Sequence, residues 1–436
     1  MMGGMAREET RTTTSLHRRN PSADDAPEPA TRAWTTRLLV VGIVLAALNL
    51  RPAITSLGAL LEEVRDGLGM SGSLAGLLTS VPPLCFAVFG VMAPRLARRF
   101  GAGAVVCAGM VAITAGLLIR PYAGGTAVFL AASALALMGI AVSNVLMPVI
   151  VKQWFPDRVG TMTGLYSMAL ALGTATAAAV TVPMTDALGG SWQTGLVVWA
   201  ALAGVAVIPW IPFVRQRPAP SAGQGPARTA PADARQPALR ITRSRTAWAL
   251  AVFFGLQATA AYITMGWLPQ IFRDAGVSAS TAGLLLAVTM VMGVPLAFVI
   301  PRVATRLPHQ GPIVLALGAC GLAGYAGLYF APAAGAWAWA VLLGIANCAF
   351  PLALTMVGMR ARTGAGVAQL SAFAQSTGYL LSIPGPLLVG VLYQHSGGWG
   401  LPIALMTCLM IPQTVVGVLA GRDRTVEEEA AASAAR

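Results

Sequence analysis

Twelve long apolar runs dominate the sequence and constrain its fold more than any other feature. They lie at about 38–61, 73–94, 101–119, 126–151, 161–184, 193–214, 247–271, 281–301, 312–331, 335–359, 366–393 and 399–420. Each is close to the roughly 20 residues that an α-helix needs to cross a bilayer. The runs lack the short alternation of apolar and polar residues that is typical of barrel strands. Because only helices and closed barrels satisfy their backbone in lipid, the runs predict an all-α polytopic membrane protein with twelve transmembrane helices.

The number and placement of the charged residues favour a membrane protein and exclude a nucleic-acid-binding protein. They make up 10% of the chain, against about 25% in soluble domains. The net charge of +13 could indicate a nucleic-acid partner. The basic residues, however, lie between apolar runs instead of on one face, and no aromatic-plus-basic recognition motif accompanies them. We therefore predict the lipid bilayer, and no nucleic acid, as a partner.

The basic residues also predict the orientation of the chain. Segments on the same side as the N-terminus hold 25 Lys and Arg residues, and the opposite loops hold three, Arg65, Arg120 and Arg273. Cytoplasmic loops of membrane proteins carry the excess of Lys and Arg. The bias predicts a multi-pass protein of the plasma membrane with both termini in the cytoplasm.

Five parts follow from the polar segments. We predict a disordered cytoplasmic tail at 1–37, which has no apolar stretch near its start and is no cleavable signal peptide. Six-helix bundles are expected at 38–214 and 247–420. A Pro-, Ala- and Arg-rich cytoplasmic linker at 215–246 separates them, and a cytoplasmic tail at 421–436 follows.

The two bundles repeat each other. "GMSGSLAGLLTSV" (69–81) and "GVSASTAGLLLAV" (276–288) match at eight of thirteen positions, with an offset of 207 residues. "PRLARRF" (94–100) and "PRVATRL" (301–307) share Pro and two Arg at the same offset. Two six-helix halves of one orientation are parallel repeats, an arrangement of transporters that alternate access by rocking one half against the other.

The segment "GVMAPRLARRFG" (90–101) resembles the Gly-x-x-x-Asp-Arg-x-Gly-Arg-Arg signature of the major facilitator superfamily. The residues that fit it are Gly90, Arg95, Arg98 and Arg99. Pro94 stands where that superfamily has an acidic residue that helps to lock one conformation, so this segment lacks the acidic partner of that lock. The resemblance implies the major facilitator fold and assigns the four fitting residues to conformational change.

Three further stretches resemble the cyanate permease / 2-nitroimidazole transporter (CynX/NimT) family. They are "LNLRPAITSLGALL", "FGLQATAAYITMGWLPQIFRDAGVS" and "LMGIAVSNVLMPVIVKQWF". The resemblance implies a secondary active or facilitative carrier of a small anion or small polar weak acid such as cyanate. An exporter of small aromatic or nitroimidazole-like drugs is the alternative. The superfamily resemblance also implies that spans one, four, seven and ten line a central cavity.

Arg51 lies in the middle of the first apolar run, where its burial costs about 2.5–3.5 kcal/mol. None of the sixteen acidic residues lies deep in an apolar run, so no carboxylate is available to offset that cost. A deep cation without a deep anion leaves room for an external anion, which a guanidinium can hold with two hydrogen bonds. The alternative is that Arg51 snorkels outward or bonds freed carbonyls. Pro52 cannot donate to the Leu48 carbonyl, which predicts an opened helix beside the charge.

Polar residues in the other cavity-lining spans complete the predicted site. The candidate substrate contacts are Arg51, Asn49, Thr55, Asn144, Gln257, Tyr262, Asn347, Gln375 and Tyr379. Pro52, Pro148 and Pro351 are candidates for conformational change, because each frees a backbone carbonyl. Hydrogen bonding between helices is the alternative role for each amide and hydroxyl.

Several chemistries lack a signature. The apolar runs carry no catalytic constellation, the five cysteines have no metal-binding spacing, and no GxxxxGK[ST] loop is present. We therefore expect no enzyme, cofactor, metal or ATP, but a small-molecule substrate and a monomer. An anion entering a cell works against about 2.3 kcal/mol per 100 mV, which favours exchange, facilitated flux or a proton travelling with the substrate.

Overall fold

The computed structural model describes residues 29–215 and 241–434, and no strand occurs in that part of the chain. Twelve of its helical segments are long and apolar enough to cross a membrane. They are Trp34–Ala59, Gly72–Phe100, Ala102–Tyr122, Thr126–Trp154, Thr161–Ala187, Trp192–Val214, Arg245–Asp274, Ala279–Ala304, Gly311–Phe330, Ala336–Met359, Gly366–Ser396 and Gly400–Ala420. Each coincides with one of the predicted runs to within a few residues. The prediction of twelve transmembrane helices is confirmed.

The first half of the chain forms α1 to α8. Their bounds are α1 Pro29–Asn49, α2 Pro52–Ala59, α3 Leu61–Leu68, α4 Gly72–Phe100, α5 Ala102–Ile119, α6 Thr126–Trp154, α7 Val159–Ala187 and α8 Trp192–Val207. Short 3-10 helices follow three of them, namely η2 (Arg120–Tyr122), η3 (Pro156–Arg158) and η4 (Ile208–Arg215).

The second half begins with η5 (Ile241–Arg243) and continues through α9 to α18. Their bounds are α9 Arg245–Asp274, α10 Ala279–Val291, α11 Gly293–Ala304, α12 Gly311–Phe330, α13 Ala336–Asn347, α14 Ala349–Met359, α15 Gly364–Ser382, α16 Pro384–Ser396, α17 Gly400–Ala420 and α18 Val426–Ala434.

The polar segments differ in part from their prediction. Helix α1 begins at Pro29, where a proline suits the first helical turn, so residues 29–37 are helical instead of disordered. Residues 1–28 of the predicted tail and 216–240 of the predicted linker lie outside the described residues. The predicted C-terminal tail contains α18.

Several spans consist of two helices, and proline accounts for the break in the first. Helix α1 stops at Asn49 and α2 starts at Pro52, with Arg51 between them. The predicted opening beside Arg51 is confirmed. The tenth span breaks at Cys348, three residues before Pro351. Pro148, by contrast, lies within α6, which continues through it.

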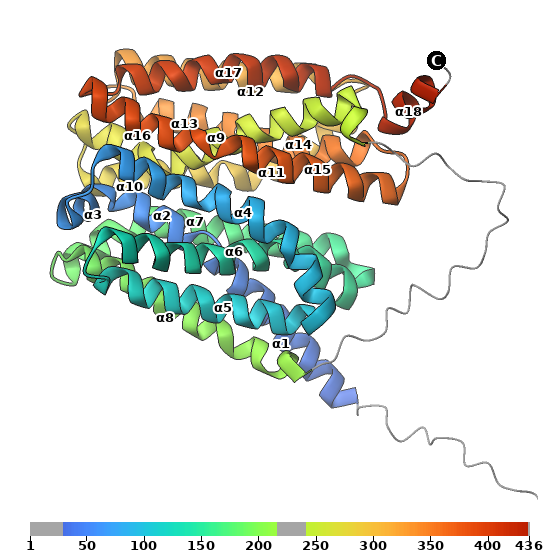
Figure 1. Ribbon diagram of the computed structural model, residues 1–436, viewed down its shortest axis with the longest axis horizontal. Coiled ribbons are helices and arrows are strands. Elements are labelled where there is room, and N and C mark those ends of the chain that lie inside the picture. The colour runs from blue at the N-terminus through green and yellow to red at the C-terminus, as the bar shows by residue number, and fades with distance from the viewer. Residues whose placement is uncertain (1–28, 216–240, 435–436) are drawn as a thin grey trace, which may run out of the picture.

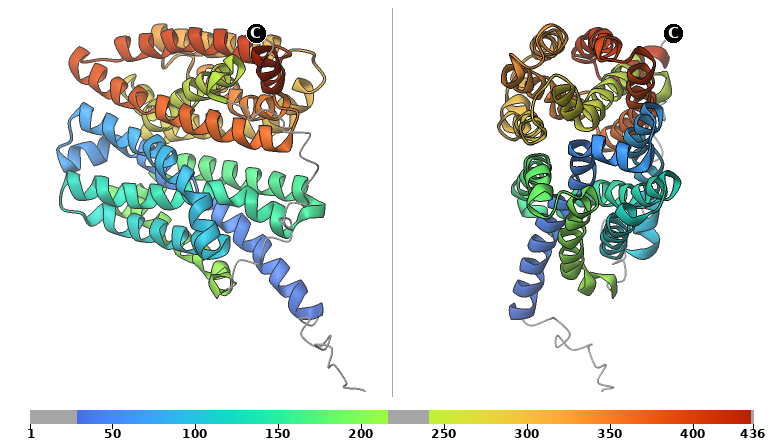
Figure 2. Two further views of the ribbon diagram at one scale, coloured as in Figure 1. Left: turned by 45° about the vertical axis from the view of Figure 1, so that its right-hand side comes forward. Right: turned by 90° about the vertical axis from the view of Figure 1, so that its left-hand side faces the viewer.

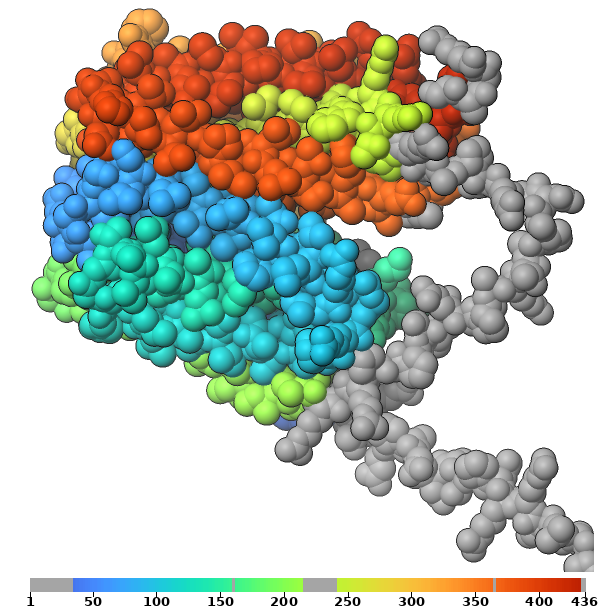
Figure 3. All heavy atoms as spheres, viewed as in Figure 1, coloured from blue at the N-terminus to red at the C-terminus, as the bar shows by residue number. Residues whose placement is uncertain are grey.

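The two halves form separate bundles that lie side by side (Figures 1 and 2). One end of the molecule carries α3 and the last turn of α9, and we call it the Arg273 end. The other carries η4, η5 and α18, and we call it the linker end. Helices α2, α4 and α7 of the first half pack across the interface on α9, α10, α15 and α16. On the face shown in Figure 3, the halves touch near the Arg273 end and diverge towards the linker end, leaving a gap between them.

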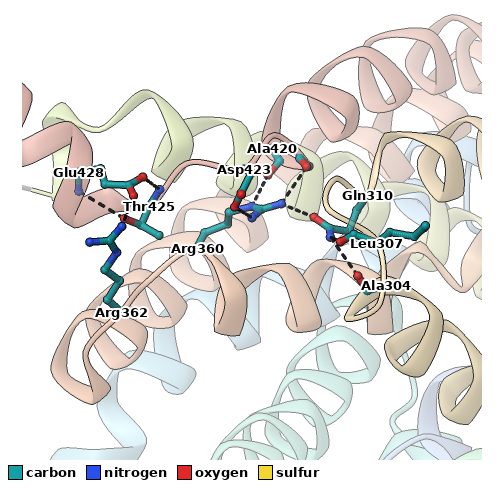
Figure 4. Close-up of polar contacts among 10 residues, drawn as sticks. Ala304, Leu307, Gln310, Arg360, Arg362, Ala420, Asp423, Thr425 and Glu428 are labelled. Carbon is teal, nitrogen blue, oxygen red and sulfur yellow. Dashed lines mark hydrogen bonds and ion pairs between the residues drawn. The ribbon is translucent and has the colours of Figure 1, made fainter.

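Polar contacts at the linker end hold loops of the second half together (Figure 4). The buried Arg360 guanidinium donates to the Ala420 carbonyl at 3.1 Å and the Gly421 carbonyl at 2.8 Å, and it also contacts Gln310 and Asp423. Burial lowers the pKa of Arg360 despite the nearby Asp423. Helix α18 is held by Glu427, which accepts from the backbone N–H groups of Arg362 at 3.0 Å and Thr363 at 3.2 Å.

Candidate substrate site

Arg51 lies half-buried at the break between α1 and α2. Its carbonyl accepts from the N–H groups of Ile54 at 2.9 Å and Thr55 at 3.1 Å, so the residue begins α2. The positive end of the α2 dipole therefore lies at the backbone of Arg51.

Aromatic residues surround the Arg51 guanidinium. Its Cζ lies 6.0 Å from the centroid of the Phe86 ring on α4. Arg51 also interacts electrostatically with the hydroxyl groups of Tyr166 on α7, Tyr262 on α9 and Tyr379 on α15. We call these five residues the Arg51 cluster. Since α9 and α15 belong to the second half, the cluster lies between the two halves.

The rings of the cluster also pack on one another. Phe86 stacks on Tyr379, with ring centroids 5.1 Å apart and planes at 26°, and lies 6.5 Å from Tyr262. Phe254 packs edge-on against Tyr379 at 5.1 Å. Rings held in this way present a firm, mostly apolar wall to a bound molecule.

No carboxylate pairs with Arg51 in the described part of the chain. The four ion pairs found there are Arg273–Glu62, Arg273–Glu63, Arg360–Asp423 and Arg362–Glu428. All of them lie near the ends of the molecule. In that part of the chain, the neighbours of the Arg51 guanidinium are aromatic rings and phenol hydroxyls instead of carboxylates.

The predicted residues of the first half divide into two groups. Asn144 accepts a hydrogen bond from Tyr166 and so connects to the cluster through that ring. Thr55 is buried, and its hydroxyl donates to the Arg51 carbonyl at 3.2 Å, which stabilises the helix break. The Asn49 amide donates to the carbonyls of Leu45 at 2.8 Å and Leu202 at 3.3 Å. It fastens α1 to α8 and does not join the cluster.

The predicted amides of the second half mainly bond one another. Gln257 Nε2 donates to the Asn347 carbonyl at 2.9 Å and to Asn347 Oδ1 at 2.8 Å. Gln257 Oε1 accepts from Gln413 Nε2 at 3.0 Å. This network joins α9, α13 and α17 within one half. Gln375 Nε2 donates to the Ser371 hydroxyl at 2.8 Å. Gln375 lies one helical turn before Tyr379, on the same face of α15.

The signature-like segment lies at the linker end of α4. Arg95, Arg98 and Arg99 are exposed there, and none of them takes part in the ion pairs of the described residues. Gly90 faces α6, where an added Cβ would lie 3.6 Å from Val145. Pro94 is exposed as well.

The two halves are joined by ion pairs at the Arg273 end, which sequence reasoning missed. Arg273 Nη2 lies 2.8 Å from Glu62 Oε2, and Nη1 lies 2.9 Å from Glu63 Oε1. The Arg65 guanidinium lies 5.5 Å from the centroid of the Tyr393 ring. These contacts link α3 of the first half to α9 and α16 of the second. We call Glu62, Glu63 and Arg273 the end latch.

Sequence reasoning also missed Phe86 and Tyr166. Both lie in apolar runs, where an aromatic residue looks the same whether it packs in a core or faces a site. The one available clue to Tyr166 was Asn144, a predicted lining residue that accepts its hydrogen bond.

Comparison with known proteins places this geometry in context. The family model described as Major Facilitator Superfamily matches residues 39–381. The chain is 33% identical over 397 residues to the 2-nitroimidazole transporter of Escherichia coli (strain K12), covering 89% of this chain and 96% of that protein. It is 30% identical over 362 residues to the cyanate transport protein CynX of the same organism, covering 83% and 91%.

A solved structure supports the fold. The crystal structure of a D-xylose-proton symporter superposes with a TM-score of 0.68 at 14% sequence identity, covering 90% of this chain and 99% of that one. At this identity the likeness concerns the fold alone. It agrees with an all-helical fold of two bundles.

Proposed function

The chain belongs to the Major Facilitator Superfamily, in its CynX/NimT-like branch, and from that premise we propose that this membrane transporter carries a small anion such as cyanate, with Arg51 as the anion contact. One observation carries the proposal. The Arg51 guanidinium, unpaired among the described residues, lies between the two halves and next to side chains of both.

The surroundings of Arg51 favour one class of anion. The guanidinium offers parallel N–H donors that fit a planar oxyanion or a carboxylate. The phenol hydroxyls of Tyr262 and Tyr379 can donate further hydrogen bonds, whereas the Tyr166 hydroxyl already donates to Asn144. The face of the Phe86 ring has no hydrogen-bond donor, so it cannot compensate a strongly hydrated anion for the water that the anion loses on binding. Planar or linear anions with weak hydration therefore fit best.

The same geometry couples the anion to alternating access. Arg51 belongs to the first half, and Tyr262 and Tyr379 belong to the second, so an anion bound among them draws the halves together. The Arg273 end is closed by ion pairs and the halves diverge at the linker end, so we propose that the site exchanges substrate with the linker end in this conformation. We propose that this end faces the cytoplasm, as the bias of basic residues predicts.

We propose exchange or facilitated flux as the mode of transport, in the plasma membrane and by a monomer that performs no catalysis. The Arg51 cluster contains no carboxylate that could take up a proton during the cycle. A proton can still enter with a substrate that is itself a weak acid. Without such a proton, each monovalent anion imported works against about 2.3 kcal/mol per 100 mV.

Export of small aromatic or nitroimidazole-like compounds is the second candidate. It is supported by the packed rings of Phe86, Tyr379 and Phe254 and by the relative named 2-nitroimidazole transporter. A neutral aromatic substrate would stack on these rings and would depend little on Arg51.

Thermal stabilisation of the purified protein separates the two candidates. Wild type and Arg51→Gln would be titrated with cyanate, nitrate, benzoate and 2-nitroimidazole. Arg158→Gln, at an exposed arginine to which no role is assigned, serves as the matched control. We expect an anion to raise the Tm of wild type and of the control but not of Arg51→Gln. Stabilisation by 2-nitroimidazole alone, equal in all three proteins, would refute the anion carrier in favour of the drug exporter.

A further inference from the structure

A second arginine of the first half is more deeply buried than Arg51. Arg120 is the first residue of η2, directly after α5, and is only 1% exposed. The sequence placed it in a loop, but the side chain turns inward against α2. Its Nη1 donates to the Ala53 carbonyl at 2.9 Å, and its Nη2 lies 3.5 Å from Ser56 Oγ.

Part of this guanidinium has no partner. The Nε of Arg120 makes no hydrogen bond, and none of the ion pairs among residues 29–215 and 241–434 includes Arg120. A buried charge that lacks a counter-charge and leaves a donor unbonded is strongly unfavourable. The packing at this point therefore maintains a positive charge at a cost in stability.

A small cavity adjoins Arg120. Its volume is about 20 Å³, and Arg120, Ser133, Thr79 and Tyr262 are among the residues that line it. Ser133 is also 1% exposed, and its hydroxyl has no hydrogen-bond partner either. Arg120 Nε and the Ser133 hydroxyl are thus two donors without a partner, and both residues line the same cavity. Because one of the donors is part of a cation, this combination suits an anion.

The cavity is closed by the second half. Most of its lining comes from α2, α4, η2 and α6, and only Tyr262 and Gly266 on α9 come from the other bundle. In the conformation seen here the space admits one water-sized species. Separation of the halves at the Arg273 end would withdraw α9 and uncover Arg120 and Ser133.

We propose that Arg120 and Ser133 form a second anion site, which fills from the Arg273 end when that end opens. Its ligand is the small inorganic anion or carboxylate that the Arg51 cluster carries, so the inference rests on the proposed function. Tyr262 lines the Arg120 cavity and also adjoins Arg51. An anion released from one arginine can therefore pass to the other along this tyrosine.

The test uses two pairs of variants of the full chain. Arg120→Gln is compared with Arg51→Gln, and Ser133→Ala with Ser143→Ala. Ser143 is the matched control, because it is a buried serine of the same helix with an unpartnered hydroxyl, yet it does not line the cavity. The measured quantity is the concentration of nitrate or cyanate that gives half of the maximal rise in Tm.

We expect this concentration to rise at least tenfold in Arg120→Gln and about threefold in Ser133→Ala, because the first change removes a charge and its hydrogen bonds and the second removes one neutral donor. Ser143→Ala should match wild type. If Arg120→Gln fails to fold, the two serine variants alone decide. A lower Tm without any change in the half-maximal concentration would assign Arg120 and Ser133 to packing and overturn the second site.

The outcomes also distinguish this inference from the proposed function. Stabilisation that depends on Arg51 but not on Arg120 or Ser133 would overturn the second site and leave the anion carrier in place. Stabilisation that depends on Arg120 and Ser133 but not on Arg51 would support the second site and remove Arg51 as the contact. No stabilisation of wild type by either anion would overturn both.

Discussion

Neutralising the end latch should shift the conformational equilibrium of the transporter towards opening at the Arg273 end. The double variant Glu62→Gln, Glu63→Gln removes two ion pairs of 2.8 and 2.9 Å that cross between the halves. It leaves the size of both side chains almost unchanged, so that packing is preserved.

The magnitude follows from the exposure of the three side chains. Arg273 is 17% exposed, whereas Glu62 and Glu63 are 38% and 32% exposed, so water screens both pairs. Exposed ion pairs contribute about 0.2–1 kcal/mol each. The two together therefore stabilise the closed end by about 0.4–2 kcal/mol, which corresponds to a factor of about 2–30 in the opening equilibrium.

Spin labels at Asp66 and Ser396, exposed positions on the two halves at this end, would report the opening as a distance distribution. The labels require a background in which the exposed Cys408 is replaced. The matched control is Arg362→Gln, which removes an ion pair that lies within one half. A longer-distance population should grow in the double variant and stay constant in the control. An unchanged distribution in the double variant would show that the end latch does not hold this end closed.

Three further predictions concern the helix break, the amide network and the C-terminal helix. Pro52→Ala restores a backbone donor, so the break between α1 and α2 should close and Arg51 should turn away from its aromatic neighbours. The nitrate concentration that gives half-maximal stabilisation should then rise at least threefold, while the Tm without nitrate does not fall. Gln257→Leu leaves Asn347 unpaired, which should cost about 1–2 kcal/mol of stability in thermal unfolding without changing that nitrate concentration. Burial by itself would raise the pKa of Glu427, but its hydrogen bonds hold that pKa below the ordinary value. The docked α18 is therefore fully stabilised above the ordinary carboxyl pKa, and this stabilisation is lost as the pH falls through the lower pKa of the folded state. Hydrogen exchange of residues 426–434, measured between pH 6 and pH 3, would detect the loss.

Features that depend on a single segment could be predicted from the sequence. The twelve spans follow from the length of each apolar run, because lipid forces every backbone group to bond within its own helix. The break beside Arg51 follows from Pro52 alone, since the missing N–H is a property of that residue. The repeat and the signature-like segment were likewise sufficient to predict the superfamily.

Features that depend on how helices face one another required the tertiary structure. The rotation of each helix decides whether a polar residue meets the site or a neighbouring helix, and in lipid that rotation is set by packing against other helices. This is why Asn49 and Gln257 bond within their own halves, while Phe86 and Tyr166, which carry no polar signal or a weak one, adjoin Arg51.

The charges at the span ends illustrate the same division. From the sequence, Arg120 and Arg273 are equivalent cations in loops of one side. In the folded protein Arg120 turns into the first bundle against α2, whereas Arg273 reaches across to carboxylates some 210 positions earlier in the chain. Local sequence determined that both charges lie near the ends of helices. Only the packing of whole helices decided that one became a buried cation beside a cavity and the other a contact between the halves, because each of these environments is built from segments distant in the chain.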